Sequence, residues 1–432
     1  MSKIRLCPEC SQEVNVCWCI PCNSAHFKND FDKWTSGNDI IDKFIQDSQL
    51  NSDGMSQVIE WIPYDRFQDI KQIAKGGFGT IYYARWIDGP IVDWDAVNKR
   101  WVRRSNPCEV VLKKFDGIGD INEEFLNEIS VHLKYHASSA IHFYGITKDP
   151  ETQKYITAAG YLKGGNYRKF LNNNYNKFDW YRKLDNLRLI AFLLKDLHES
   201  NIIHQDLHPG NILLSNLQGY ILCISDFGLS KLVGKNVENP QKRNVFGVLP
   251  YIAPEVLAGE EYTKAADVYS FAMIAYEVIT GLPPYSNVPH DDELALKICE
   301  GLRPKIPFHN PKLITQIIMQ CWDVRVTHRP TFEELNIKFE RYVKDYFENE
   351  YKNNNEITIQ IKEAEEFSKN QKTNETPINY ETHPKAIYTS RLLNFSNLPE
   401  PVNEPNFENE LEEMTESFSC IATNDDIDDF DF

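Results

Sequence analysis

The stretch that decides the fold of this chain runs Ile202-Ile-His-Gln-Asp206-Leu-His-Pro-Gly-Asn211 and, after Ile-Leu-Leu, continues in Ile224-Ser-Asp226-Phe-Gly-Leu. It sets an Asp and an Asn five positions apart on a tight loop and a second Asp before Phe-Gly. Such residues supply a base for a hydroxyl and two oxygen ligands for Mg²⁺. Any one piece is compatible with an ordinary loop, but their order and spacing together indicate phosphoryl-transfer chemistry.

Two features upstream fit the same chemistry. Ile73-Ala-Lys-Gly-Gly-Phe-Gly-Thr-Ile81 predicts a glycine-rich turn between strands, where backbone amides can approach phosphates without a Cβ in the way. The apolar strand Glu109-Val-Val-Leu-Lys113 ends in a lysine, which is costly to bury unless it meets anionic partners. Glu128, on a predicted helix, is a candidate partner for Lys113; the alternative is a lysine that reaches solvent.

With these motifs the chain resembles a eukaryotic protein kinase. The resemblance continues through Tyr251-Ile-Ala-Pro-Glu255, Ala266-Asp267-Val-Tyr-Ser-Phe, Gly281-Leu-Pro-Pro-Tyr285, Cys321-Trp322 and His328-Arg-Pro-Thr-Phe332. Cys-Trp before Arg-Pro-Thr-Phe resembles the tyrosine-kinase-like group of serine/threonine kinases. The whole chain, including Trp34-Thr-Ser-Gly-Asn and Ala386-Ile-Tyr-Thr-Ser-Arg-Leu-Leu, is similar to an expanded fungal set in that group with an N-terminal Cys-pair module.

The resemblance implies an α+β, bilobal kinase fold at residues 64–346, with an antiparallel-sheet N-lobe and a helical C-lobe, that transfers the ATP γ-phosphate to Ser/Thr hydroxyls in intracellular signalling. It implies that Lys113 holds the phosphates, Glu128 orients Lys113, Asp206 accepts the hydroxyl proton, and Asn211 and Asp226 hold Mg²⁺. Glu255 is expected to pair with Arg329, and Asp267 to anchor the catalytic loop. The implied ATP-binding residues are Ile73, Gly76, Gly77, Gly79, Ile81, Lys113, Ala159 and Tyr161.

Several positions depart from the family pattern. Ala74 replaces the first glycine, Val111 a small alanine above adenine, and Gln205 the arginine before the catalytic Asp. His208 stands where a lysine usually contacts the γ-phosphate, and Ala158-Ala-Gly160 replaces a bulky gatekeeper and an acidic hinge residue. The alternative is therefore a nucleotide-binding pseudokinase scaffold, although the Lys, the base Asp and the metal Asp are all kept.

The activation loop lacks the usual phosphorylation switch. Residues 231–250 contain no Ser, Thr or Tyr, and Gln205 cannot pair with a phosphate as the family's arginine does. We therefore expect activity that does not depend on phosphorylation of this loop.

Charge and composition limit which binding partners and which cellular locations are expected for this chain. The 432 residues carry a net charge of −17, and the part from Tyr346 onward holds 20 acidic against 6 basic residues. A nearly neutral body with an acidic tail argues against nucleic-acid binding, which needs clustered positive charge. The chain starts without the apolar region of a signal peptide, and no apolar run approaches the length of a membrane span. We expect a cytoplasmic protein with protein substrates and signalling partners and no membrane association.

Five of the ten cysteines fall in the first 22 residues. Cys7-Pro-Glu-Cys10 and Cys19-Ile-Pro-Cys22 are two C-x-x-C pairs whose thiolates suit tetrahedral Zn²⁺, and so small a module needs a metal to fold. Cys17 and His26 are substitute ligands, so the ligand set stays open, as does the alternative of reduced cysteines in a frayed terminus. A zinc module at 1–30 and a helical linker at 31–60 follow, the latter from an amphipathic pattern capped at Thr35, Ser36 or Asn38.

Two further segments lie outside the kinase pattern. The charged, aromatic stretch between Trp86 and Val110 predicts a hairpin insertion. Residues 347–432 are rich in Asn, Glu, Thr and Pro, which predicts an acidic, mostly disordered tail. Within it the more apolar island Ala386–Val402 is a candidate docking segment or short linear motif.

Overall fold

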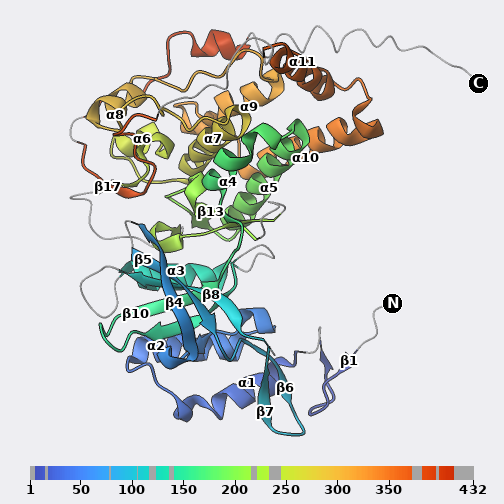
Figure 1. Ribbon diagram of the computed structural model, residues 1–432, viewed down its shortest axis with the longest axis vertical. Helices are drawn as coiled ribbons and strands as arrows, with labels where there is room; N and C mark the ends of the chain where they lie inside the picture. The colour runs from blue at the N-terminus through green and yellow to red at the C-terminus, as the bar shows by residue number, and fades with distance from the viewer. Residues whose placement is uncertain are drawn as a thin grey trace, which may run out of the picture. The chain divides into compact units, whose positions relative to one another are not determined.

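The computed structural model describes residues 5–14, 18–76, 79–104, 106–115, 123–135, 141–215, 221–232, 245–371, 382–395 and 398–412. Their contacts form two compact units, labelled by element in Figure 1. Unit 1 comprises Met1–Lys163 with Cys223–Gly228, and unit 2 comprises Gly164–Leu222 with Leu229–Phe432. Unit 1 is built mainly on strands and unit 2 mainly on helices, which confirms the predicted α+β class.

Unit 1 is organised around one six-stranded sheet. The strand order is β3 (Glu60–Trp61), β9 (Phe143–Lys148), β10 (Tyr155–Gly160), β8 (Cys108–Phe115), β5 (Gly79–Trp86) and β4 (Phe67–Gly76). All neighbours are antiparallel except β3, which pairs parallel to β9. On β8, Val110 and Leu112 are buried and alternate with less buried residues, and together with Trp86 of β5 they belong to one core of this sheet.

The other core of unit 1 joins helices to the sheet. Helix α3 (Glu123–Lys134) contributes Phe125 and Ile129, and helix α2 (Asp39–Asn51) contributes Ile41 and Ile45. Of the three caps considered for α2, Asn38 is the one whose side chain accepts hydrogen bonds from the first backbone amides. The predicted helical linker is thus a folded part of unit 1.

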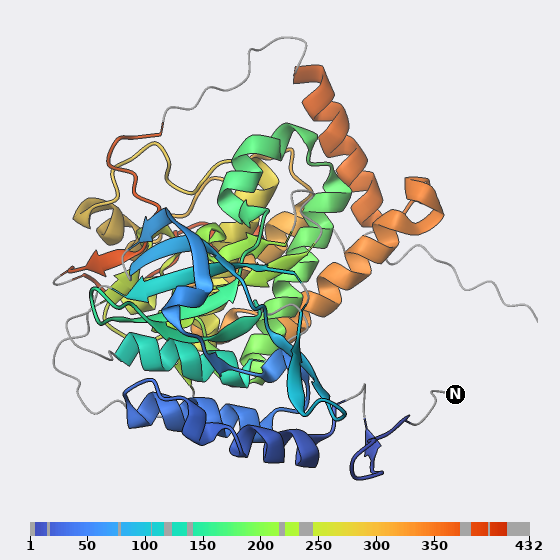
Figure 2. The same cartoon turned by 60° about the horizontal axis from the view of Figure 1, so that its bottom comes forward.

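The N-terminal residues pack on the predicted hairpin insertion. Strands β1 (Arg5–Leu6) and β2 (Glu13–Val14) precede helix α1 (Ile20–Lys28), which runs beside α2 (Figure 2). Strands β6 (Ile91–Asp95) and β7 (Arg100–Arg103) form the hairpin. Phe27 of α1 stacks on Trp101 of β7 at 4.1 Å between ring centroids, and His26 stacks on Trp94 at 3.8 Å. The insertion therefore serves as a platform for the cysteine-rich segment.

Unit 2 is a helical body with short strand pairs. Its helices are α4 (Tyr167–Asn174), α5 (Trp180–Glu199), α6 (Pro254–Leu257), α7 (Lys264–Thr280), α8 (Asp292–Cys299), α9 (Lys312–Cys321), α10 (Phe332–Phe347) and α11 (Glu356–Gln371). Helix α7 is buried almost all round. Strand β11 (Gly165–Asn166) pairs with β13 (Ile212–Leu214), and β12 (Ile202–Ile203) pairs with β15 (Lys231–Leu232); β14 (Leu222–Ile224) leads into unit 1.

Much of the acidic tail is folded onto unit 2, which corrects the expectation of disorder for these residues. Helix α11 buries Ile357, Ile361 and Ala364 and packs against α10. Strand β17 (Arg391–Leu393), labelled in Figure 1, pairs antiparallel with β16 (Val245–Gly247). Composition alone gave the wrong expectation for these residues. A few apolar residues at helical or strand spacing are enough to order a segment that packs against an already folded surface. Among the described residues no helix is long and apolar enough to cross a membrane.

Candidate active site

A buried carboxylate anchors the loop that carries Asp206. Asp267, at the start of α7, accepts hydrogen bonds from the backbone amides of His204 at 2.8 Å and Gln205 at 3.1 Å. The loop needs this support because Gln205 adopts a φ of 67°, which is unfavourable for a residue with a side chain. The anchoring contact expected of Asp267 is present.

The Asp206 carboxylate is buried, with 4% of the residue exposed. The Asn211 side chain donates to the backbone oxygen of Asp206 at 2.8 Å and to its Oδ2 at 3.1 Å. Oδ1 of Asp206 accepts no hydrogen bond within the described part of the chain. Its lone pairs therefore remain available for a further contact.

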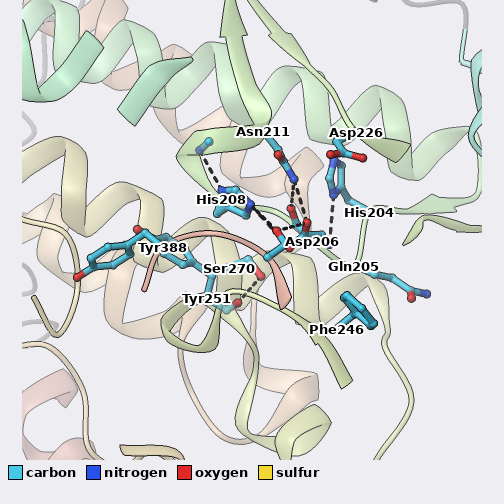
Figure 3. Close-up of polar contacts among 12 residues, drawn as sticks. His204, Gln205, Asp206, His208, Asn211, Asp226, Phe246, Tyr251, Ser270 and Tyr388 are labelled. Carbon is cyan, nitrogen blue, oxygen red and sulfur yellow. Dashed lines mark hydrogen bonds and ion pairs between the residues drawn. The ribbon is translucent and has the colours of Figure 1, made fainter. Parts of the chain in front are cut away.

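A hydroxyl group from the tail lies on this carboxylate. Ser390 Oγ donates to Asp206 Oδ2 at 2.6 Å, and His208 Nε2 lies 3.1 Å from the same Oγ. His208 Nδ1 accepts the Gly210 amide at 3.0 Å, so the ring proton is assigned to Nε2, which then donates to Ser390 Oγ. Figure 3 shows His208 and Asn211 directed toward Asp206.

Unit 1 holds the second charged cluster. Lys113 Nζ, on β8, lies 2.5 Å from Glu128 Oε2 on α3 and 2.8 Å from Asp226 Oδ1. Burial alone would favour the neutral amine, but the carboxylates of Asp226 and Glu128 outweigh it and raise the pKa of Lys113 above its ordinary value. Lys113 is therefore a fixed positive charge at neutral pH, and the expected Lys113–Glu128 pair is present.

The described residues that are expected to bind nucleotide lie on the six-stranded sheet or, for Tyr161, directly after β10. Gly76 and Gly79 are partners at the end of the β4–β5 hairpin, with Ile73 and Ile81 on its strands, while Gly77 lies outside the described residues. A Cβ on Gly79 would sit 2.2 Å from the Lys114 carbonyl oxygen, so that position requires glycine. Val111 of β8 is directly opposite Ala159 of β10, and the ring of Tyr161 contacts Tyr83.

A buried ion pair between Arg329 and Glu255 stabilises unit 2. The Arg329 guanidinium donates to both Glu255 carboxylate oxygens, at 2.6 and 2.7 Å, and its Nε donates to the Asp323 backbone oxygen at 2.7 Å. The kinase resemblance implied that Glu255 and Arg329 pair, and the pair is present. The adjoining activation loop is described only up to Leu232 and again from Val245, so most of the loop prediction falls on residues outside the described ranges.

Comparison with known proteins identifies the family. The model of the protein tyrosine and serine/threonine kinase family matches residues 67–339. The chain belongs to this family. Its kinase domain is similar to a putative serine/threonine-protein kinase/receptor, R831, of Acanthamoeba polyphaga mimivirus: 30% identity over 297 residues, covering 68% of this chain and 16% of that protein.

Two further relatives carry similar names. The serine/threonine-protein kinase VIK of Arabidopsis thaliana is 30% identical over 285 residues, covering 64% of this chain and 60% of VIK. The probable serine/threonine-protein kinase roco5 of Dictyostelium discoideum is 28% identical over 309 residues, covering 68% of this chain and 10% of roco5. The chain thus spans less than two thirds of the length of each of these relatives.

The cysteine cluster lies outside the matched kinase range. The Sγ atoms of Cys7, Cys10, Cys19 and Cys22 all lie within 4.8 Å of one another. His26, considered as a substitute ligand, instead contacts Glu9 at 2.8 Å and stacks on Trp94. Cys17 lies outside the described residues. The paired C-x-x-C spacing predicted from sequence therefore does bring four thiols together.

The sequence reasoning missed the role of the tail at this site. Ser390 and Tyr388 were noted within an apolar island and a family-like stretch, without a role, and Arg168, which contacts Tyr388, was not singled out. The signal was the stretch from Ala386 onward in an otherwise polar tail. Nothing in it indicated which surface it would cover.

Proposed function

We propose that this chain is a Mg²⁺-dependent protein serine/threonine kinase that transfers the γ-phosphate of ATP to protein hydroxyls. The observation that carries the proposal is a serine hydroxyl hydrogen-bonded to the buried Asp206 carboxylate at 2.6 Å. That separation is within the range in which a general base takes a proton. Family membership and the names of the relatives support the same reaction.

Each group of residues has its own proposed role. In unit 2, Asp206 orients the acceptor hydroxyl and takes its proton, while Asn211 fixes the carboxylate. In unit 1, Lys113 holds the nucleotide phosphates and Glu128 orients Lys113. Because phosphoryl transfer needs little covalent assistance, such positioning and charge stabilisation supply most of the catalysis.

The donor set suits the nucleotide and its metal. Asn211 and Asp226 offer the amide and carboxylate oxygens that Mg²⁺ prefers, and Lys113 offers a fixed cation. Bound Mg²⁺ would neutralise phosphate charge as it develops. The proposed nucleotide-binding positions are Ile73, Gly76, Gly77, Gly79, Ile81, Lys113, Ala159 and Tyr161.

Substitution of the usual lysine by His208 is compatible with this function. His208 Nε2 lies 3.1 Å from the acceptor hydroxyl, so the imidazole orients the oxygen by a hydrogen bond where a lysine would act as a charge. The departure thus retains a donor at the reacting group. This contact favours an active enzyme over the pseudokinase alternative.

The test is transfer of labelled phosphate from Mg²⁺-ATP to a general protein acceptor such as casein. Wild type should label serine and threonine, and Asp206→Ala and Lys113→Ala should each lose nearly all activity while remaining folded. Asp292→Ala, which removes an exposed carboxylate at the start of α8, is the matched control and should behave as wild type. Equal labelling by Asp206→Ala and wild type would refute the assignment.

Finer assignments follow from the sequence. We place the chain in the tyrosine-kinase-like group, near the expanded fungal set, because Cys321-Trp322 precedes Arg329-Pro-Thr-Phe332. Cytoplasmic signalling, with protein partners and without nucleic acid, is our proposal for its setting.

We also propose a structural Zn²⁺ at Cys7, Cys10, Cys19 and Cys22. A tetrahedron with Zn–S distances of about 2.3 Å has sulfur–sulfur edges of about 3.8 Å. The Cys7–Cys22 and Cys10–Cys19 pairs lie 3.8 and 3.5 Å apart, so the donor set fits the ion. The folded segment buries Trp18, whose indole donates to the Ser52 backbone oxygen at 3.0 Å and so ties the module to the linker.

A further inference from the structure

Residues 382–395, which we call the tail segment, lie along unit 2 and reach Asp206. The segment enters by two backbone hydrogen bonds: the His383 amide donates to the Ser286 oxygen at 2.8 Å, and the His290 amide donates to the Lys385 oxygen at 3.0 Å. Arg391 then donates to the His290 backbone oxygen at 2.6 Å. The path is therefore defined by contacts before and after Ser390.

The far end of the tail segment joins unit 2 as a strand. Leu393, Leu392 and Arg391 pair antiparallel with Val245, Phe246 and Gly247 of β16. Leu393 is buried with 5% exposed, while Leu392 on the opposite face is 42% exposed. The two strands form a two-stranded sheet of their own. Strand pairing is a recurring way to bind an extended peptide, because main-chain hydrogen bonds give affinity and alternate side chains give specificity. The register here brings the residue just before β17, Ser390, to the catalytic carboxylate.

A second anchor fixes the segment on the other side of Ser390. The guanidinium of Arg168 lies 4.8 Å from the centre of the Tyr388 ring and donates to the Tyr388 backbone oxygen at 2.9 Å. Tyr388 Oη donates to the Pro284 oxygen at 2.8 Å. Arg168 is itself held by Tyr251 and Glu277, so the ring rests on a fixed cation.

Of the two adjacent hydroxyl residues, only Ser390 is directed at the base. Thr389 is exposed, whereas Ser390 is half-buried with its Oγ between Asp206 Oδ2 and His208 Nε2. A hydroxyl has one proton and two lone pairs. Donation to Asp206 uses the proton and acceptance from His208 uses one lone pair, which leaves the second lone pair for bond formation.

We propose that the tail segment occupies the peptide-acceptor site of its own kinase domain and that Ser390 is the hydroxyl it presents for phosphorylation in cis. The proposal rests on the kinase function proposed above. Ser390 Oγ forms a bond to the γ-phosphorus of ATP, the bond from that phosphorus to the β–γ bridging oxygen breaks, and ADP leaves. The hydroxyl proton passes to Asp206. The products are phosphoserine 390, ADP and one proton.

The modification also frees the acceptor site. Phosphoserine carries close to two negative charges at neutral pH. These charges would lie against the buried Asp206 carboxylate, which repels them. The unmodified segment therefore competes with other substrates, and the modified segment leaves the site to them.

The first experiment maps the acceptor and its origin. Full-length protein made with a co-expressed phosphatase is incubated with Mg²⁺-ATP, and phosphate at Ser390 is followed by mass spectrometry at several protein concentrations. We expect Ser390 to be modified with a first-order rate constant that does not change with protein concentration. Ser390→Thr should keep the modification, Ser390→Ala should lose it, and Thr389→Val is the matched control that should behave as wild type.

The outcomes separate this inference from the proposed function. Phosphate on casein or on other residues, with none at Ser390, overturns the inference and leaves the kinase assignment standing. A rate that rises in proportion to protein concentration overturns presentation in cis. Absence of phosphate on every acceptor overturns the kinase assignment, and this inference falls with it.

The second experiment measures competition by the unmodified segment. Ser390→Ala keeps the strand pairing and the Tyr388 anchor but cannot be modified, so its acceptor site stays occupied. If the site is open about one tenth of the time, the KM for casein rises about tenfold at similar kcat relative to Ser390-phosphorylated wild type. Tyr388→Ala in the Ser390→Ala background should restore the lower KM. An equal KM in all three proteins would contradict occupancy of the acceptor site.

Discussion

Val111 and Ala159 lie directly opposite each other on β8 and β10. Val111 is larger than the alanine of the kinase pattern, and Ala159 is smaller than the usual gatekeeper. The added volume therefore lies beside the volume that is freed. Volume-conserving exchanges of this kind are the ones that packed sites tolerate best. In the proposed nucleotide site, this pair would keep the volume similar while both a small and a large position change.

The alanine at position 159 should admit ATP analogues with a bulky N6 substituent. We expect N6-benzyl-ATP to serve as a phosphate donor for wild type, and Ala159→Met to use ATP but lose the analogue. Steady-state kinetics with both donors provides the check. Failure of wild type to use the analogue, with use gained in Val111→Ala, would show instead that Val111 limits the site.

His142 gives a prediction about pH. Burial, with a smaller contribution from Arg104, lowers the pKa of His142 to about 4, against about 6.5 in an unfolded chain. Between these values the unfolded state takes up a proton that the folded state does not, so the free energy of unfolding should fall as pH drops from about 6.5 toward 4.

The measurement is the urea midpoint of unfolding across this pH range for wild type and His142→Gln. The variant should lose part of the acid-side decline, since glutamine does not titrate. Identical pH profiles for the two proteins would exclude His142 as a contributor.

At the scale of elements, the β4–β5 hairpin depends on Gly79 more than on Gly76, its partner across the hairpin. A Cβ at Gly79, where φ is 151°, meets the Lys114 backbone oxygen at 2.2 Å, whereas a Cβ at Gly76 meets nothing within 4 Å. Gly79→Ala should therefore destabilise unit 1 by about 1–3 kcal/mol through backbone strain. Gly76→Ala is the matched control and should change the free energy of unfolding by much less. Equal losses in urea unfolding would count against the proposed close approach.

Elements set by local pattern were predictable, and so were the distant contacts that the kinase resemblance implies, such as Glu255 with Arg329. The contacts of the tail, which that resemblance does not cover, were not. The Lys113–Glu128 pair joins residues 15 apart on a strand and helix whose periods are visible in the sequence. The Ser390–Asp206 contact spans 184 residues and depends on the pairing of β17 in the tail with β16 of unit 2. The tail appeared disordered because composition reports what a segment can bury alone and not what it can bury against an existing surface.

At the scale of the whole molecule, two further segments flank the residues that match the kinase family. The cysteine-rich segment packs on unit 1, and the tail packs on unit 2. The stacking of Phe27 and His26 on the β6–β7 hairpin ties the first to the sheet. We expect one Zn²⁺ per chain by elemental analysis. Cys10→Ser should abolish binding because it removes one of four thiolates.

Cys17→Ser is the control for that prediction and should retain the metal, since Cys7, Cys10, Cys19 and Cys22 already supply a complete set. Loss of zinc in Cys17→Ser, or a metal-free wild type, would contradict the assigned ligands. Chelation should also expose the buried Trp18 indole, which a fluorescence shift would report.

The measurement that tests the central claim most directly is autophosphorylation of the full-length protein in Mg²⁺-ATP beside an Asp226→Ala variant. Asp226 contacts Lys113 at 2.8 Å and is the proposed metal ligand, so the variant should still fold but transfer almost no phosphate. Our account predicts Mg²⁺-dependent incorporation into wild type, recovered on acid hydrolysis as phosphoserine or phosphothreonine. Equal incorporation by Asp226→Ala, or none by either protein, would contradict it.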